Sequence, residues 1–271
     1  MIIIIMTRGR VGKQETLKHL PKKWKDRTVL LCPPGEEHDH HSISCVARNY
    51  SEKFQWIYQG KYFGFNDKVV IMDDDLWFNQ YRDGRLCTVK DPEENEPLFD
   101  LMEAMLDEIP LVGVHPRMMA QNAKPPFEWN GKIVTVQGLN RRLLPKGLKL
   151  DHDPILADVW LNCEVLSRGL PNARITTHFV DWLPSQAAGG CDYRTAEMQQ
   201  IATKRIADAF PNHATQVVKT PKTAKWLGES RYDLRVSWKR LYNDAPKSHL
   251  LDDGKGEHQA AEGDGSSETV E

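Results

Sequence analysis

The sequence contains no run of about 18 consecutive apolar residues, the length that a membrane-spanning helix requires. Its apolar opening, residues 1–6, is too short for a signal peptide and has no basic region before it. The five cysteines are an odd number without a Cys-x-x-Cys pair, which excludes a disulfide scaffold and a zinc knuckle. No Gly-rich loop ends in Lys-Ser or Lys-Thr, which excludes P-loop phosphate binding. We therefore expect a cytoplasmic protein with reduced thiols and no membrane partner.

The net charge of −2 is unevenly distributed along the 271 residues. Residues 243–271 carry eight acidic side chains against two lysines, a charge of −6, which leaves +4 for residues 1–242. The C-terminal segment is also rich in Gly and Ser and has few large apolar residues, so burial cannot offset the entropy of ordering it. The sequence thus predicts one folded, mildly basic domain over 1–242 and a disordered acidic tail over 243–271.

Apolar patterning in the folded part predicts an α/β protein. Short β-branched or apolar runs indicate buried strands, and amphipathic stretches between them indicate helices. We expect one domain with a mixed, mainly parallel sheet flanked by helices. The expected strands are 1–6, 28–32, 41–48, 68–72, 132–137 and 174–178, and the expected helices are 13–20, 97–107, 158–167 and 195–210.

An acidic triplet directly follows one of these strands. Asp73, Asp74 and Asp75 come after the apolar run 68–72, and ligand sites of open α/β sheets lie beyond the carboxyl ends of the strands. Alternate residues of an extended chain point the same way, so Asp73 and Asp75 could face one site. Carboxylate oxygens suit Mg²⁺ or Mn²⁺, especially beside nucleotide phosphates. The alternative is a solvated acidic turn.

Three further features could contribute to the same site. Thr7-Arg8-Gly9-Arg10 follows the first strand, and such a loop can bring backbone amides and guanidinium groups to a phosphate or a base. Asp158 opens an expected helix, where it is either a helix-stabilising carboxylate or a general base. His178 ends an expected strand, where it is either structural or a third metal ligand.

Basic residues alternate with aromatic ones near the end of the folded part. Such a stretch can bind phosphates and stack on unpaired bases, or it can form solvated faces with core aromatics. The candidates for nucleic-acid contact are Lys219, Lys222, Lys225, Trp226, Arg231 and Arg235.

The segment 36–41, Glu-Glu-His-Asp-His-His, has the ligand types of a zinc site. Adjacent residues cannot all converge on one ion, so an exposed loop after Pro33-Pro34-Gly35 is the favoured interpretation.

The first strand with its TRGR loop, the triplet Asp73–Asp75, the Ala157-Asp158 opening of a helix that ends with Arg168-Gly169, and His178 together resemble the GT-A glycosyltransferases. More narrowly, the TRGR start with Thr16 and Leu17, the DDDLWF block and the HFVDW segment with the later Gly189-Gly190 resemble the GT-A-like group associated with phage DNA hypermodification. The resemblance covers about residues 1–200. The resemblance implies a metal-dependent transfer of a sugar from a nucleotide-sugar donor of the UDP-sugar type to a 5-hydroxymethylpyrimidine in DNA. It would place the protein in the host cytoplasm.

The resemblance also implies roles for individual residues. Asp73 and Asp75 would bind Mn²⁺ or Mg²⁺ with the donor diphosphate, and His178 would complete the metal shell. Asp158 would face the acceptor. The remaining donor-binding residues would be Thr7, Arg8, Gly9, Arg10 and Asp74.

Two other enzymatic activities remain open at this level. The acceptor could be a protein, a glycan or a small molecule, because fold and donor site do not fix the acceptor. Paired aspartates after a strand also serve Mg²⁺-dependent nucleotidyltransferases. A nucleic-acid-binding protein without catalysis would leave the acidic triplet unexplained.

Overall fold

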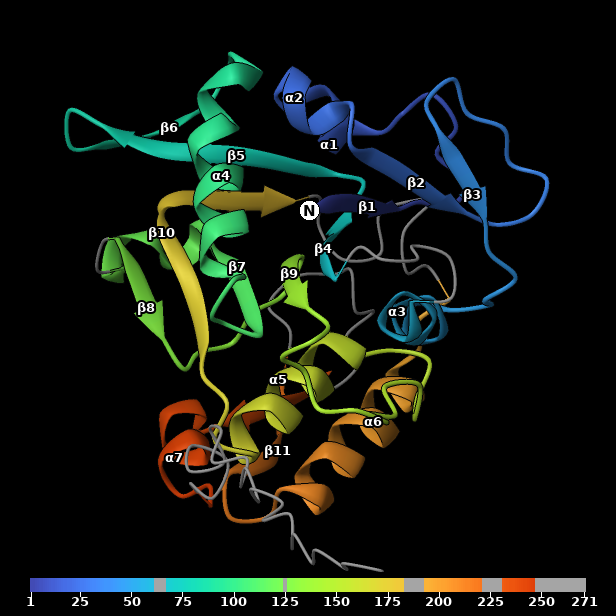
Figure 1. Cartoon of the computed structure of the whole chain (residues 1–271). Helices are drawn as coiled ribbons and strands as arrows, with labels where there is room; N and C mark the ends of the chain where they lie inside the picture. The colour runs from blue at the N-terminus through green and yellow to red at the C-terminus, as the bar shows by residue number, and fades with distance from the viewer. Residues whose placement is uncertain (61–66, 124–125, 183–192, 221–230, 247–271) are drawn as a thin grey trace, which may run out of the picture.

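The computed structural model describes residues 1–60, 67–123, 126–182, 193–220 and 231–246. Its centre is a ten-stranded sheet in which nine strands follow the order β3-β2-β1-β4-β9-β7-β10-β5-β6 and β8 pairs with β10 (Figure 1). The strands are β1 (Ile2–Met6), β2 (Thr28–Cys32), β3 (Ser42–Ser44), β4 (Lys68–Asp73), β5 (Leu76–Arg82), β6 (Arg85–Thr88), β7 (Leu111–Pro116), β8 (Phe127–Trp129), β9 (Val136–Asn140) and β10 (Asn172–Trp182).

Most strands of this sheet run in one direction. β1, β2, β3 and β4 are mutually parallel, and β7 and β10 are parallel to each other. β9 is antiparallel to both β4 and β7, so β7 and β10 share the direction of β4. β5 and β8 are antiparallel to β10, and β6 is antiparallel to β5. Only β5, β8 and β9 therefore oppose the majority, and the predicted α/β class with a mixed, mainly parallel sheet is confirmed.

Helices cover both faces of the sheet because the central strands are apolar on both sides (Figure 1). In β1, Ile4 and Met6 belong to one buried cluster and Ile3 and Ile5 to the other. The first cluster includes residues of α3 (Tyr50–Gln59) and α5 (Ala157–Ser167), and the second includes residues of α2 (Lys22–Lys25) and α4 (Glu96–Met105). α1 (Glu15–Lys18) and two 3₁₀ turns, Pro92–Asn95 and Arg117–Asn122, complete this part.

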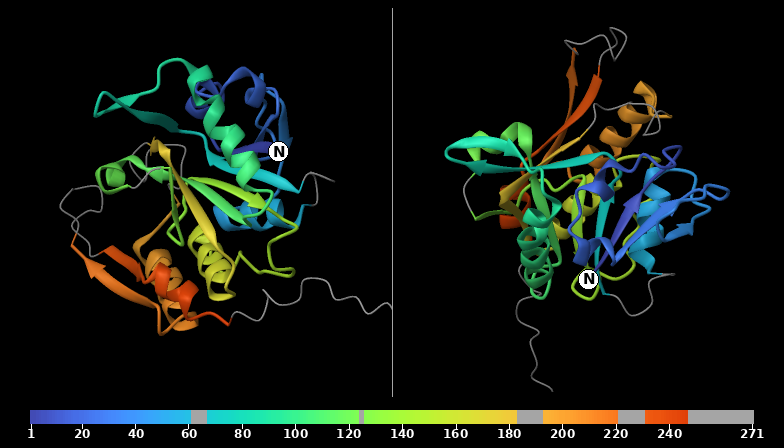
Figure 2. Two further views of the ribbon diagram at one scale, coloured as in Figure 1. Left: turned by 60° about the vertical axis from the view of Figure 1, so that its left-hand side comes forward. Right: turned by 90° about the horizontal axis from the view of Figure 1, so that it is seen from above.

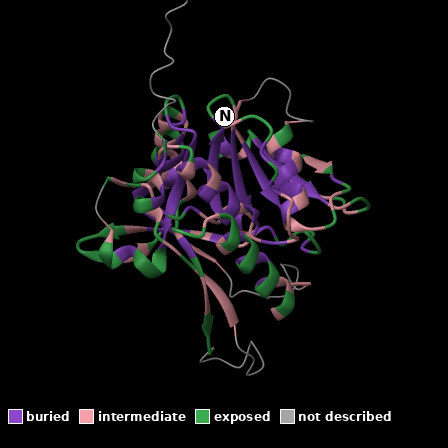
Figure 3. Cartoon of the chain, turned by 90° about the horizontal axis from the view of Figure 1, so that it is seen from below, coloured by how far each residue is buried: buried purple, intermediate pink, exposed green. Residues whose placement is uncertain are grey.

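A second, two-stranded sheet pairs β11 (Ala214–Lys219) with β12 (Arg231–Val236) and projects from the body (Figures 2 and 3). α6 (Ala196–Ala209) packs on it through Gln216, whose amide donates to Thr203 at 2.8 Å. α7 (Trp238–Asn243) follows. Asp244 binds His213 at 3.0 Å and Ala245 is buried, so the folded body continues past the predicted boundary at residue 242.

Of the helix expected at 13–20 only the single turn Glu15–Lys18 forms, and after Pro21 a second turn, Lys22–Lys25, follows that was not expected. The strand expected at 132–137 is shifted to Val136–Asn140. Those expected at 1–6, 28–32 and 68–72 and the helices expected at 97–107, 158–167 and 195–210 are present within two residues of their bounds. No helix among the described residues has the length and apolar character to cross a membrane.

Candidate functional site

The strand order reverses between β1 and β4, which are neighbours in the sheet. From β1 the chain continues outward through β2 and β3 on one side, and β4 opens the other side. Such a switch point leaves a crevice outside the carboxyl ends of the two strands, where α/β proteins bind nucleotides. β1 ends at Met6, paired with Asp73 at the end of β4. The predicted loop 7–10 and the acidic triplet therefore lie side by side at this point.

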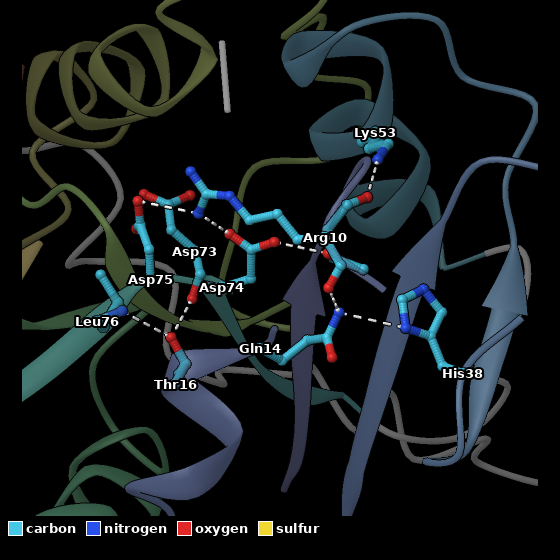
Figure 4. Close-up of polar contacts among 10 residues, drawn as sticks. Arg10, Gln14, Thr16, His38, Lys53, Asp73, Asp74, Asp75 and Leu76 are labelled. Carbon is cyan, nitrogen blue, oxygen red and sulfur yellow. Dashed lines mark hydrogen bonds and ion pairs between the residues drawn. The ribbon is translucent and has the colours of Figure 1, made fainter. Parts of the chain in front are cut away.

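A single arginine joins the two segments (Figure 4). Nη1 of Arg10 lies 2.6 Å from a carboxylate oxygen of Asp74 and 3.1 Å from one of Asp75. The hydroxyl of Thr7 donates to the other oxygen of Asp74 at 2.6 Å. Both oxygens of Asp74 are thus engaged within the protein, and its carboxyl group holds the loop rather than facing a ligand.

Hydrogen bonds from α1 fix the backbone of the acidic turn. The hydroxyl of Thr16 donates to the carbonyl oxygen of Asp73 at 2.6 Å and accepts from the amide of Leu76 at 2.9 Å. Thr16 is fully buried. It therefore fixes the point where β4 ends and β5 begins, so that Asp73 and Asp75 point to the same side (Figure 4).

Asp73 carries the most perturbed carboxyl group of the site. Burial raises its pKa well above the usual range, and the charge of Asp75 raises it further. Within the described part of the chain its carboxylate makes no hydrogen bond or ion pair. Two carboxyl groups with perturbed pKa values on one side of a crevice are typical of a functional site, and their oxygens are the ligands that Mg²⁺ and Mn²⁺ prefer.

Asp158 lies near enough to Asp73 to affect its ionisation. It lies in the first turn of α5, and its charge contributes to the raised pKa of Asp73. Burial raises the pKa of Asp158 itself, while the nearby cations Lys132 and Arg194 act in the other direction. The structure thus brings Asp158 to the predicted aspartates, together with two cations that the sequence analysis did not single out.

Two residues next to the site have left-handed backbone conformations. Thr135 has φ of 63° and accepts the amide hydrogen of Asp73 at 3.3 Å through its carbonyl oxygen. Leu156, the N-cap of the helix that carries Asp158, has φ of 68°. Branched and bulky side chains rarely adopt this conformation, and such strain collects at functional sites. Threonine and leucine do not favour the left-handed conformation, so the sequence gives no indication of it at these two positions.

His178 does not join the aspartates. Its ring contacts the side chain of Gln80 and lies 3.1 Å from the hydroxyl of Thr177. Burial alone lowers its pKa to about 4, with no contribution from a carboxylate. Within the described residues no group of three His, Cys, Asp or Glu side chains could hold a metal ion. We therefore leave His178 out of the candidate ligand set.

The remaining predicted donor residues differ in their exposure to solvent. Arg8 is exposed, with its guanidinium 5.7 Å from the ring centre of Tyr193. Gly9 has φ of 66°, a conformation that favours glycine in a loop approaching a ligand. Arg10 is tied to the aspartates, so in this conformation its guanidinium is not directed at a nucleotide base.

The predicted nucleic-acid residues divide into two groups. Lys222, Lys225 and Trp226 lie outside the described residues. Lys219, Arg231 and Arg235 lie on the β11–β12 hairpin, where Lys219 pairs with Arg231 across the strands and Arg235 with Thr215. Alternate residues share a face, so these three lie on the face opposite Gln216, which contacts α6.

The predicted loop 36–41 is not simply exposed. The side chain of His38 is 1% exposed, His40 contacts the carbonyl of Thr28 at 2.9 Å, and Glu36 accepts from the amide of Gly9 at 2.8 Å. A zinc site in this loop finds no support, because the described residues offer no three-ligand group. The segment instead contacts the loop that follows β1, through Glu36 and the amide of Gly9.

A cavity of about 700 Å³ lies elsewhere, near the C-terminus of α3. Its lining includes Asp67, which precedes β4, whereas Asp73 ends that strand. None of the predicted site residues lines it.

Comparison with known proteins gives likenesses to solved structures only, and these are distant. No family model and no curated protein matches the chain. A crystal structure from Desulfovibrio desulfuricans G20, described as that of a proposed nucleotide-diphospho-sugar transferase, is 12% identical and has a TM-score of 0.38. The match covers 64% of this chain and 78% of that one. A likeness of this size assigns by itself neither the fold nor the function.

Proposed function

We propose that this protein is a glycosyltransferase that uses a nucleotide-sugar donor and a divalent cation. The observation that carries the proposal is the meeting of the loop 7–10 and the acidic triplet at the switch point between β1 and β4. Nucleotides bind at such points, and the resemblance of these two motifs to GT-A glycosyltransferases supports a nucleotide-sugar donor.

The chain's residues fit a hard cation on two counts. Asp73 and Asp75 place oxygen ligands on one side of the crevice, and burial raises the pKa of both carboxyl groups. In this role a dication neutralises the charge that develops on the diphosphate leaving group. Asp75 also contacts Arg10, so the arginine and a bound cation would share this carboxylate.

The other residues have roles around the donor. Arg8 is exposed in the loop after β1, where a guanidinium can bind a phosphate. Asp158 faces the acceptor: if the reaction inverts configuration it takes the proton of the acceptor hydroxyl, and if it retains configuration it positions the substrates. Burial supports the first role, because it raises the pKa of Asp158 toward the range of a useful base.

The finer proposal is that the acceptor is a 5-hydroxymethylpyrimidine in DNA. Its support is the resemblance to the phage group, the charge of +4 on residues 1–242 and the placement of Lys219, Arg231 and Arg235 on one face of a projecting hairpin. A base in a duplex has to leave the stack to reach the crevice.

Thermal stabilisation tests the donor site. A nucleoside diphosphate should raise the melting temperature of the wild-type protein in the presence of Mn²⁺ and not in its absence. Asp75→Asn should abolish the effect, whereas Asp67→Asn, at the other end of β4, should leave it intact. Stabilisation that is independent of Mn²⁺ and of Asp75 would exclude the metal site.

Transfer assays test the acceptor. The protein is incubated with Mn²⁺, labelled nucleotide sugars, and DNA with or without 5-hydroxymethylpyrimidines. We expect label only in the hydroxymethylated DNA. Transfer to unmodified DNA, or to protein or glycan acceptors alone, would contradict the DNA proposal and leave the donor proposal standing.

A further inference from the structure

The backbone of residues 7–10 lies outside regular secondary structure, so its polar groups need partners of other kinds. Two backbone hydrogen bonds mark its ends: the amide of Thr7 donates to Leu31 at 3.1 Å, and Arg10 accepts from the amide of Lys13 at 2.9 Å. Between these ends, side chains bind the carbonyl of Thr7 and the amide of Gly9, and a further side chain binds the carbonyl of Arg10.

Three side chains from different parts of the chain each bind one backbone group of this loop. The ammonium of Lys53 in α3 donates to the carbonyl of Thr7 at 2.9 Å. Glu36 accepts from the amide of Gly9 at 2.8 Å, and the amide of Gln14 donates to the carbonyl of Arg10.

A histidine connects two of these side chains, and Figure 4 shows its contact with Gln14. Nδ1 of His38 lies 3.2 Å from the amide nitrogen of Gln14, and its Nε2 lies 3.6 Å from a carboxylate oxygen of Glu36. We name Gln14, Glu36, His38 and Lys53 the loop frame.

The fold alone gives little reason for polar side chains in these places. Lys53 and Gln14 are 6% and 7% exposed, and burial lowers the pKa of the Lys53 ammonium. A buried ammonium is unfavourable unless it is well bound, and an apolar side chain of the same length would fill the space in α3. Departures of this kind from an apolar interior are expected where function requires them.

We propose that the loop frame fixes the backbone of residues 7–10 in the conformation that receives the donor diphosphate. The inference rests on the proposed function for the identity of the ligand. The frame residues are positioning residues: they bind the loop, and the loop binds the donor. Their effect is on affinity, because a loop that is already ordered loses less entropy on binding.

The test uses the full chain and two substitutions of Glu36. Glu36→Met removes the acceptor of the Gly9 amide, and Glu36→Gln keeps an oxygen in its place. We expect the solvent exchange of the Gly9 amide, measured by NMR, to become at least about tenfold faster in Glu36→Met and to change less than about twofold in Glu36→Gln. The Kd of UDP in the presence of Mn²⁺, measured by calorimetry, should increase about tenfold in Glu36→Met and stay unchanged in Glu36→Gln.

Lys53→Met provides a second, independent variant, with circular dichroism to show that it folds. This variant should increase the Kd of UDP about as much as Glu36→Met does. Unchanged exchange of the Gly9 amide in Glu36→Met, or faster exchange with unchanged UDP affinity, would overturn the inference. If the wild-type protein binds no UDP, the proposed function fails and the donor part of this inference with it. The exchange of the Gly9 amide then still decides whether Glu36 fixes the loop.

Discussion

Arg10 lies between two carboxyl groups in the interior of the protein, with its side chain 8% exposed. Replacing it by methionine leaves Asp74 and Asp75 without their cation. Because breaking a buried ion pair costs about 3–5 kcal/mol, we expect Arg10→Met to lower the free energy of unfolding by about that amount. Urea denaturation at neutral pH measures it.

Arg10→Lys is the matched control. Lysine retains a positive charge but lacks the several N–H donors of the guanidinium group. The free energy of unfolding of Arg10→Lys should therefore lie between those of the wild-type protein and Arg10→Met. A free energy of unfolding equal to wild type in Arg10→Met would show that the carboxyl groups do not need this partner.

His178 gives the protein a specific pH dependence. Burial lowers its pKa to about 4, whereas an unfolded histidine has a pKa of about 6.5. Below pH 6.5 His178 is protonated in the unfolded chain, whereas in the folded chain it stays neutral until about pH 4. The free energy of unfolding therefore decreases as the pH falls from 6.5 to about 4. His178 contributes about 3 kcal/mol over this window.

The measurement is urea denaturation of the wild-type protein and His178→Gln between pH 4 and 8. The variant should lose less stability than wild type as the pH falls from 6.5 to 4. Equal losses in both proteins would contradict the assignment. The difference between them also removes the contribution of the site aspartates, whose raised pKa values act with the opposite sign.

Among the elements, the β11–β12 hairpin is the one whose role can be tested apart from catalysis. If its basic face binds DNA phosphates, Arg235→Ala should reduce the slope of log Kd against log salt concentration by about one, the contribution of a single phosphate contact. Arg48→Ala is the control, since Arg48 is an exposed arginine beside α3 that pairs with Glu52 at 3.0 Å. Equal slopes in the wild-type protein and Arg235→Ala would exclude this face as a DNA contact.

The elements also show which parts of the fold local sequence determines. The strand at 28–32 is predicted within its observed bounds because all five residues are apolar or β-branched and all are buried. α3 was missed: its buried face includes Ser51, Lys53 and Gln55, which give no apolar periodicity. Its sequence signal was the cap, because Asn49 accepts from the amide of Glu52 and Gly60 ends the helix in a left-handed conformation.

The candidate site was predictable only in part, for a related reason. Asp73, Asp75 and loop 7–10 could be placed because each directly follows a recognisable strand. The partners of these residues could not, since Glu36 and Lys53 reach the loop across 27 and 46 residues. His178 was placed by its strand end, but β10 continues to Trp182, so it pairs with Gln80 within the sheet.

At the scale of the whole molecule, charge is divided between the folded body and the acidic segment that follows it. Residues 247–271 contain seven acidic residues and two lysines. If this segment competes with DNA for the basic body, deleting 247–271 should tighten DNA binding at low salt and have little effect at high salt. Fluorescence anisotropy with labelled DNA at two salt concentrations measures the change, and unchanged or weaker binding at low salt would exclude competition.

The left-handed conformation of Thr135 has a consequence for how the chain would respond to selection. Threonine is β-branched, and this conformation costs it about 1–2 kcal/mol that glycine or asparagine avoids. A library randomised at this position and selected for stability alone should be enriched in glycine and asparagine. Selection for sugar transfer should keep threonine if the strained backbone beside Asp73 belongs to the working site. Enrichment of glycine under both selections would show that the strain has no part in function.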